Sequence, residues 1–233
     1  MFNIFAEVNS KPVVTIDDNY RNFHLRKSGI LYEKDFTTIT ESSMKFADVK
    51  VDGLNSPIIV VHPRGYDYNN KVAAIPAEKG FTLYAWHNFT IKDGIEYYIF
   101  DDWQPPETSS HGLKMWNERG ELLYHSDWIR LKLLGFHTLS ADIEPNTTDL
   151  KIDISRYYQH ADKLGVMIPY SRKGTFPGSS FNTWPGGGGH TMSYVYETSE
   201  CFFFRDKNTL QYAVISLGGS GGWWYNGVGW MTP

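Results

Sequence analysis

The chain has 233 residues, a formal net charge of −4, 41% hydrophobic residues and 21% charged residues. This composition excludes a disordered chain, because many large apolar side chains can offset the entropy lost when the backbone becomes ordered. No uncharged apolar run approaches the ~18 residues of a membrane-spanning helix, so we expect no membrane insertion. The mildly acidic balance predicts no nucleic acid partner. A single cysteine, Cys201, excludes an intramolecular disulfide framework and a cysteine-based zinc site.

Short β-prone runs, separated by turn residues, dominate the chain from its beginning to its end. They are rich in aromatic and β-branched residues, and 21 glycines and 11 prolines punctuate them. The runs cover residues 13–16, 57–61, 80–86, 94–100, 112–116, 121–124, 129–134, 192–196, 201–205 and 210–217. This spacing predicts a mainly β protein, either an antiparallel β-sandwich or two small β-sandwich-like domains.

Two tight turns are predicted between neighbouring runs. Asn117 and Gly120 tolerate the left-handed backbone that a hairpin turn requires, and they stand between two apolar runs. Residues 205–209 have the same character, between the runs at 201–205 and 210–217. Each pair of runs is therefore expected to form a β-hairpin.

One segment has helical instead of β periodicity. We predict at most one short helix, near residues 154–164, with Asp153 capping its start and Gly165 as a left-handed residue at its end. The residues that carry the helical spacing are Ile154, Tyr157, Tyr158, Ala161 and Leu164.

Two polar connectors divide the chain. Residues 105–110 are polar and rich in proline, and residues 140–149 form a second polar stretch. We therefore predict an N-terminal β domain at 1–104 and a C-terminal β domain at 111–233, with one continuous β domain as the alternative. Within the second half, the glycine-rich stretches 185–189 and 218–222 are expected to be loops, because glycine is unfavourable inside a strand.

Catalytic and metal-binding patterns are weak in this sequence. The sequence Gly-Gly-Ser-Gly-Gly at 218–222 resembles a nucleophile elbow, but no Asp, Glu or His follows it. The eight histidines lack metal-ligand spacing, and no cofactor is predicted. Asp101 and Asp102 end a β run before Trp103, a setting that suits either a turn or a pair of carboxylates acting on a sugar. Cys201 lies among apolar residues and is expected to be packed in the core.

The aromatic residues near the C-terminus are the best candidates for a ligand or interface site. Flat rings beside glycines can stack on sugars or anchor a protein interface, although they can also close a core. The candidates are Trp184, Trp223, Trp224, Tyr225 and Trp230.

A family resemblance appears in the middle of the chain. The run Tyr-Tyr-Ile-Phe-Asp at 97–101 is followed by a polar spacer and then by the sequence HGLKMWNERGELLYHS at 111–126. This arrangement resembles small β-rich proteins encoded among the tail genes of lambda-like phages and prophages. Their recurring pattern is a YYVFD strand, a polar spacer and then yGLqVWNexGeLvFdS. The resemblance covers roughly residues 1–140, and His125 stands where the pattern prefers Asp. We expect Leu113, Met115 and Trp116 of this motif to pack.

The resemblance implies a virion component of the tail and brings no catalytic residues with it. We therefore expect a non-enzymatic structural component of the tail tip or tail fibre region, which assembles with other tail proteins or with copies of itself. The protein would fold in the host cytoplasm and reside in the virion, in keeping with an N-terminus that shows no secretory signal.

Two alternatives stay open. One is a tip module that binds a host receptor or surface glycan through the C-terminal aromatic residues. The other is a polysaccharide hydrolase that uses Asp101 or Asp102.

Overall fold

A computed structural model of the chain describes residues 3–8, 11–17, 23–38, 44–66, 70–86, 93–107, 109–137, 150–159, 163–167, 173–183, 189–225 and 230–231. The predicted fold class is confirmed: the protein is mainly β, with several antiparallel sheets and only short helices. Within the described part of the chain, no helix has the length and apolar character needed to cross a membrane.

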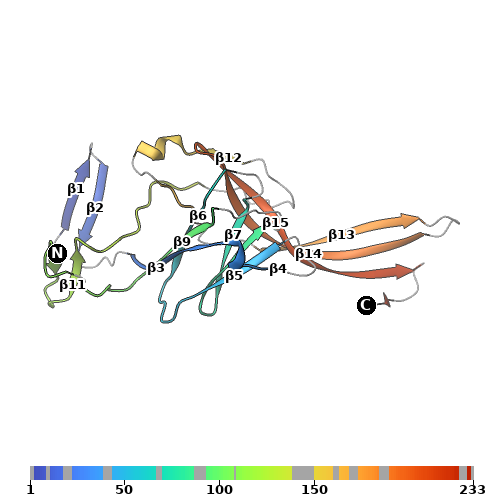
Figure 1. Cartoon of the computed structure of the whole chain (residues 1–233), viewed down its shortest axis with the longest axis horizontal. Helices are drawn as coiled ribbons and strands as arrows, with labels where there is room; N and C mark the ends of the chain where they lie inside the picture. Colours follow the sequence, from blue (N-terminus) through green and yellow to red (C-terminus); the bar gives the residue numbers. More distant parts are fainter. Residues whose placement is uncertain are drawn as a thin grey trace.

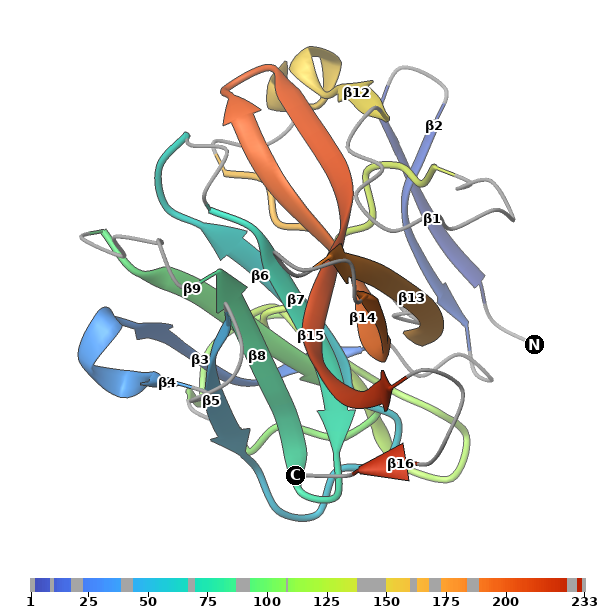
Figure 2. The same cartoon turned by 90° about the vertical axis from the view of Figure 1, so that its right-hand side faces the viewer.

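Two sheets make up the body of the protein (Figures 1 and 2). The smaller has the strand order β3-β9-β6, formed by His24–Leu31, Ile95–Asp101 and Ile58–Pro63. The larger has the order β12-β15-β14-β7-β8-β5-β4, and β13 and β16 pair with β14 and β15. Its strands are β4 (Thr37–Thr38), β5 (Met44–Lys50), β7 (Val72–Ala77), β8 (Gly80–Trp86), β12 (Lys151–Asp153), β13 (Lys173–Thr183), β14 (Gly189–Asp206), β15 (Thr209–Tyr225) and β16 (Trp230–Met231).

The two sheets share one apolar core, which gives the body its sandwich character. Strands β6 and β9 contribute one side of this core, and strands β5, β7, β8 and β14 contribute the other. Alternate residues of each strand point to opposite faces of a sheet, so only every second residue of β6 and β9 enters this core. The core residues are Val49, Ile59, Val61, Val72, Ala74, Phe81, Leu83, Ala85, Ile95, Tyr97, Ile99 and Phe202.

Strands β14 and β15 continue beyond the sandwich and, together with β13, form a three-stranded arm that extends from the body (Figure 1). The predicted runs at 192–196 and 201–205 are therefore parts of one strand of 18 residues. The prediction of a loop at 218–222 is wrong, because these residues pair with 193–197 inside the β14–β15 ladder. Gly219 and Gly221 stand opposite Tyr196 and Tyr194 in this register. Residues 184–188, which hold most of the other expected glycine loop, lie outside the described residues.

Both predicted hairpins are confirmed. Strands β10 (Lys114–Trp116) and β11 (Leu122–His125) meet at a turn in which Asn117 Oδ1 accepts hydrogen bonds from the backbone N–H groups of Arg119 and Glu121. Gly120 has a φ of 76°, in the left-handed region that favours glycine. The β14–β15 turn is fixed in a similar way, since Asn208 N–H donates to the Asp206 side chain.

The predicted helix is a short 3-10 helix, η2 (Ser155–Gln159). Asp153 does cap its start, because its Oδ1 accepts a hydrogen bond of 2.9 Å from Ser155 N–H. Gly165 is not the left-handed residue that we predicted. It is instead a point of close approach, where a Cβ atom would overlap the Val60 side chain. A second 3-10 helix, η1 (Glu33–Asp35), was not predicted.

Strands from both sides of the connector at 105–110 belong to the same sheet. Val72 of β7 pairs with Phe202 of β14, and both side chains enter the shared core. The division into two domains stays a prediction, and any boundary has to accommodate this shared sheet. The remaining strands, β1 (Asn3–Val8) and β2 (Lys11–Asp17), form a hairpin at the end of the molecule opposite the arm (Figure 1).

Candidate binding pocket

A pocket of about 630 Å³ lies on the face of β6 and β9 that points away from the sandwich core. In the β6–β9 ladder, Val60 pairs with Tyr98, and these two residues alternate with the core residues Ile59, Val61 and Ile99. Strand pleating therefore gives one face of this ladder to the core and the other to the pocket. The volume falls within the range of small-molecule sites, which are typically concave and mostly apolar.

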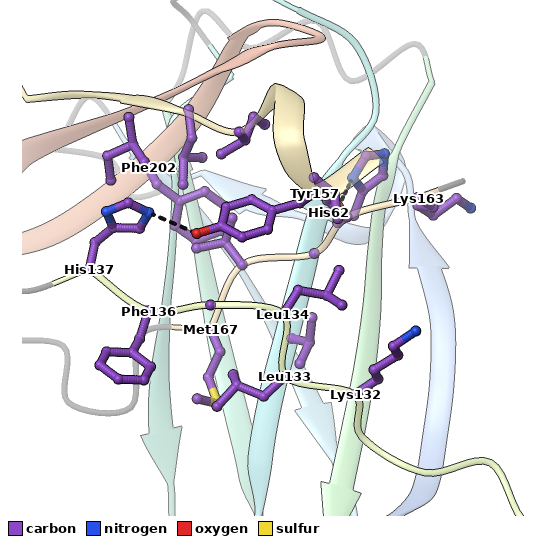
Figure 3. Close-up of a pocket in the computed structure, with 18 of the residues that line it drawn as sticks. His62, Lys132, Leu133, Leu134, Phe136, His137, Tyr157, Lys163, Met167 and Phe202 are labelled. Carbon is purple, nitrogen blue, oxygen red and sulfur yellow. Dashed lines mark hydrogen bonds between the residues drawn. The ribbon is translucent and has the colours of Figure 1, made fainter. Parts of the chain in front are cut away.

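One wall of the pocket is the extended segment 131–137 (Figure 3). Our prediction of a strand at 129–134 is wrong. Two backbone hydrogen bonds, from Leu25 N–H to Ile129 and from Leu131 N–H to Phe23, hold the start of this segment beside β3. Beyond Leu131 the segment leaves the sheet, and its apolar residues line the pocket instead of joining a ladder.

The opposite wall comes from β12, η2 and the residue between them: Ile152, Ile154 and Tyr157 line the pocket. The Tyr157 hydroxyl lies 3.5 Å from Nε2 of His137 on the first wall, as the dashed line in Figure 3 marks. Gly135 permits this approach, because a Cβ atom there would lie within 3 Å of the Tyr157 ring carbons. The two walls therefore meet through a glycine and a tyrosine.

A polar cluster borders the pocket where β6 ends and β9 begins. Lys163 Nζ donates a 2.6 Å hydrogen bond to Glu96 Oε2, the Tyr98 hydroxyl donates to the same oxygen, and Arg64 Nε lies 3.2 Å from Glu96 Oε1. Burial raises the pKa of Glu96, but the hydrogen bonds from Lys163 and Tyr98 outweigh it and hold the pKa below its usual value. The hydrogen bond to Glu96 also raises the pKa of Lys163. One carboxylate thus balances two cations, Arg64 and Lys163.

His62 stands at the inner side of this cluster. Its Nδ1 lies 2.6 Å from the carbonyl oxygen of Leu164, and its ring lies 5.3 Å from that of Phe204. Burial lowers the pKa of His62 below 6.5, so the imidazole is neutral at pH 7. A neutral ring with Nδ1–H donating to the carbonyl leaves Nε2 as an acceptor.

The charged side chains among the described residues that line the pocket are lysines. Among the residues that the structure describes, its lysines and histidines are Lys132, Lys163, His62 and His137, and no Asp or Glu lines it. This is notable in a chain with a net charge of −4. Leucine, isoleucine, valine, phenylalanine and methionine supply most of the remaining surface.

The aromatic residues that we predicted as a contact site are elsewhere, on the arm. Trp223, Trp224 and Tyr225 end β15, and Trp230 begins β16. The register places Trp224 opposite Trp230, so two of the predicted residues occupy one cross-strand position. Trp184 lies outside the described residues.

The Asp101 carboxylate is buried and holds a neighbouring loop in place through hydrogen bonds. It accepts hydrogen bonds from the backbone N–H groups of Asn55, Ser56 and Asp102, with the shortest at 2.7 Å from Ser56. These bonds attach the loop before β6 to the end of β9, as expected of a carboxylate in a turn. The side chain is fully buried, so the geometry offers no room for substrate at this oxygen pair.

The predicted packing of Cys201 is confirmed. The thiol is fully buried against Ala73, Phe203 and Ala213, and desolvation raises its pKa. Among the described residues, no group of three or more His, Cys, Asp or Glu side chains is arranged to hold a metal ion.

Sequence reasoning missed the pocket. The sequence feature that could have indicated it is the apolar stretch at 131–136, which predicts a strand equally well. No known family model matches the chain, and neither a curated protein nor a solved structure shows significant similarity to it.

Proposed function

We propose that the protein is a non-enzymatic structural component of the tail of a phage or prophage and acts through protein–protein assembly. The observation that carries this proposal is the concentration of exposed apolar side chains in one part of the chain. Leu113 and Trp116, in the motif that resembles the tail proteins, are 61% and 55% exposed. Our expectation that these two side chains pack is therefore wrong, whereas Met115 is partly buried.

The same part of the chain holds three further exposed apolar residues: Ile129, Leu133 and Phe136. Single exposed apolar residues are ordinary, whereas several on one surface mark an interaction site. These five residues share a stretch of the sequence, and two of them, Leu133 and Phe136, line the pocket. Aromatic side chains such as Trp116 are also enriched at the energetic centres of protein interfaces. These features support a role in binding another protein.

The arm adds a second kind of contact. Among the described strands, β13 pairs only with β14, so within the described part of the chain one edge of its 11 residues has no strand partner. Such an edge can pair with a strand of a neighbouring chain. Pro177 fits this edge position, since proline cannot donate a ladder hydrogen bond.

Substitution in the phage or prophage that encodes the chain tests the role of the motif. We expect Trp116→Ser to reduce the amount of the protein in purified particles at least ~10-fold, because it removes a large apolar contact while the fold persists. Tyr66→Ser is the matched control, since Tyr66 is also 55% exposed but lies outside the motif. Equal incorporation of both variants, each folded by circular dichroism, would argue against this surface.

A second candidate is a tip module that binds a host glycan. The cross-strand position shared by Trp224 and Trp230 favours it, because paired aromatic residues can offer stacking surface to a sugar. A glycan array probed with the whole chain would support this function if Trp224→Ala abolished a signal that Trp116→Ser left intact. An array without any signal would count against it.

A further inference from the structure

We infer that the pocket between β6, β9 and the segment 131–137 binds an anionic single-chain amphipath, a fatty-acid-like carboxylate whose alkyl chain fills the apolar interior. The inference is independent of the assembly role. It rests on the volume of the pocket, on its apolar lining and on the sign of its ionisable residues.

The interior suits an alkyl chain. Val60, Leu134, Ile152 and Phe202 come from four separate parts of the chain and present hydrocarbon to the same space. Each methylene transferred from water into such a space contributes about a fourfold gain in affinity. Apolar pockets of this size occur mostly where a ligand replaces water, and the volume of about 630 Å³ exceeds that of a packing defect.

The polar groups suit a single negative charge. Figure 3 shows Lys132 and Lys163 toward one end of the pocket and His137 toward the other. An ammonium group has three donors, so Lys163 can donate to a second carboxylate while it holds Glu96. Because Arg64 also pairs with Glu96, this cluster keeps an excess of one positive charge. A cationic ligand would find no Asp or Glu to pair with among the described residues that line the pocket.

Titration calorimetry with the whole chain tests the chemistry of the ligand. We expect decanoate to bind with a stoichiometry of one, and hexanoate to bind roughly 250-fold more weakly because four methylenes are lost. Decyltrimethylammonium has the same chain and the opposite charge, and we expect no measurable binding. Equal affinity for decanoate and decyltrimethylammonium, or no binding of decanoate, would overturn the inference.

Amino-acid substitutions test whether decanoate binds in this pocket. The double variant Lys132→Gln, Lys163→Gln should lower the affinity for decanoate about 10-fold. Its affinity for decan-1-ol should change less than twofold, because the alcohol lacks the charge. Met167→Trp narrows the pocket and should weaken both ligands at least ~10-fold. Lys79→Gln, in the exposed turn between β7 and β8, is the matched control. Decanoate binding that survives both pocket changes, in variants with an unaltered thermal midpoint, would also overturn the inference.

Discussion

The two faces of the β6–β9 ladder are built from the same strands but have different roles. On the inner face Ile59, Val61 and Ile99 are at most 5% exposed and pack against the larger sheet. On the outer face Val60, His62 and Tyr98 are only partly buried and border a pocket. Strand alternation therefore gives one face of this pair of strands to the core and the other to the wall of the pocket. A substitution should therefore act on unfolding or on binding according to the face on which it lies.

The largest effect is expected on the inner face. Ile99→Ala removes a fully buried side chain from the centre of the sandwich, and we expect a loss of about 3 kcal/mol in the free energy of unfolding. Val60→Ala on the outer face should cost about 1 kcal/mol or less, because its surroundings already contain empty space. Urea denaturation measures both values. Similar losses of unfolding free energy in the two variants would show that the two faces contribute equally to stability, contrary to our account.

A smaller effect is expected where the ladder is attached to its neighbouring loop. Asp101→Asn places an amide N–H₂ group among the backbone donors of Asn55 and Ser56, and we expect a loss of about 2 kcal/mol in unfolding free energy. Asp102→Asn is the control and should cost less, since the hydrogen bond that Asp102 accepts from the Asn55 side chain is long, at 3.4 Å. A larger loss for Asp102→Asn would show that we have assigned the anchoring role to the wrong carboxylate.

A residue of the outer face, His62, should also make the free energy of unfolding depend on pH. The folded-state pKa of His62 is lowered, so the unfolded chain binds more protons and stability falls as pH drops below about 6.5. The slope from one such histidine is at most about 1.4 kcal/mol per pH unit. His62→Asn keeps a donor for the Leu164 carbonyl and should flatten the decrease in unfolding free energy between pH 7 and pH 5.

His24 also has a pKa lowered by burial, so part of the slope should remain in the His62→Asn variant. His111→Asn, in the exposed spacer, is the matched control. An unchanged slope in His62→Asn would mean that this imidazole titrates alike in the folded and unfolded chains.

The smallest effect is expected at the rim of the pocket. Phe136 is 84% exposed, so Phe136→Ser should change the unfolding free energy by no more than about 0.5 kcal/mol. Thermal or urea unfolding would measure this value. A loss above about 1 kcal/mol would show that Phe136 contributes to the core and does not belong to the outer surface.

Local chemistry made much of the fold predictable. Hairpin turns depend on a few residues that tolerate unusual backbone angles, and Asn117 and Gly120 identify one directly. Strand β8 matches its predicted bounds of 80–86 because its aromatic and apolar run is bounded by turn residues. The capping role of Asp153 follows equally from a local hydrogen bond.

Long-range pairing explains what sequence reasoning missed. Residues 218–222 look like a loop because of their glycines, yet the partner strand supplies a ladder that holds them extended. Conversely, the apolar residues at 131–136 look like a strand but find no ladder partner beyond Leu131 and line the pocket instead. Strand β7 was not predicted, because its residues 72–75 are buried on both faces of the larger sheet, which hides the alternation that marks a half-buried strand.

Quantitative mass spectrometry of purified particles, from the phage or prophage that encodes the chain, tests the proposed assembly role most directly. We expect the protein to co-purify with the tail proteins at a constant ratio through successive gradients. A chain that stays in the soluble lysate, with none in the purified particles, would contradict the proposal.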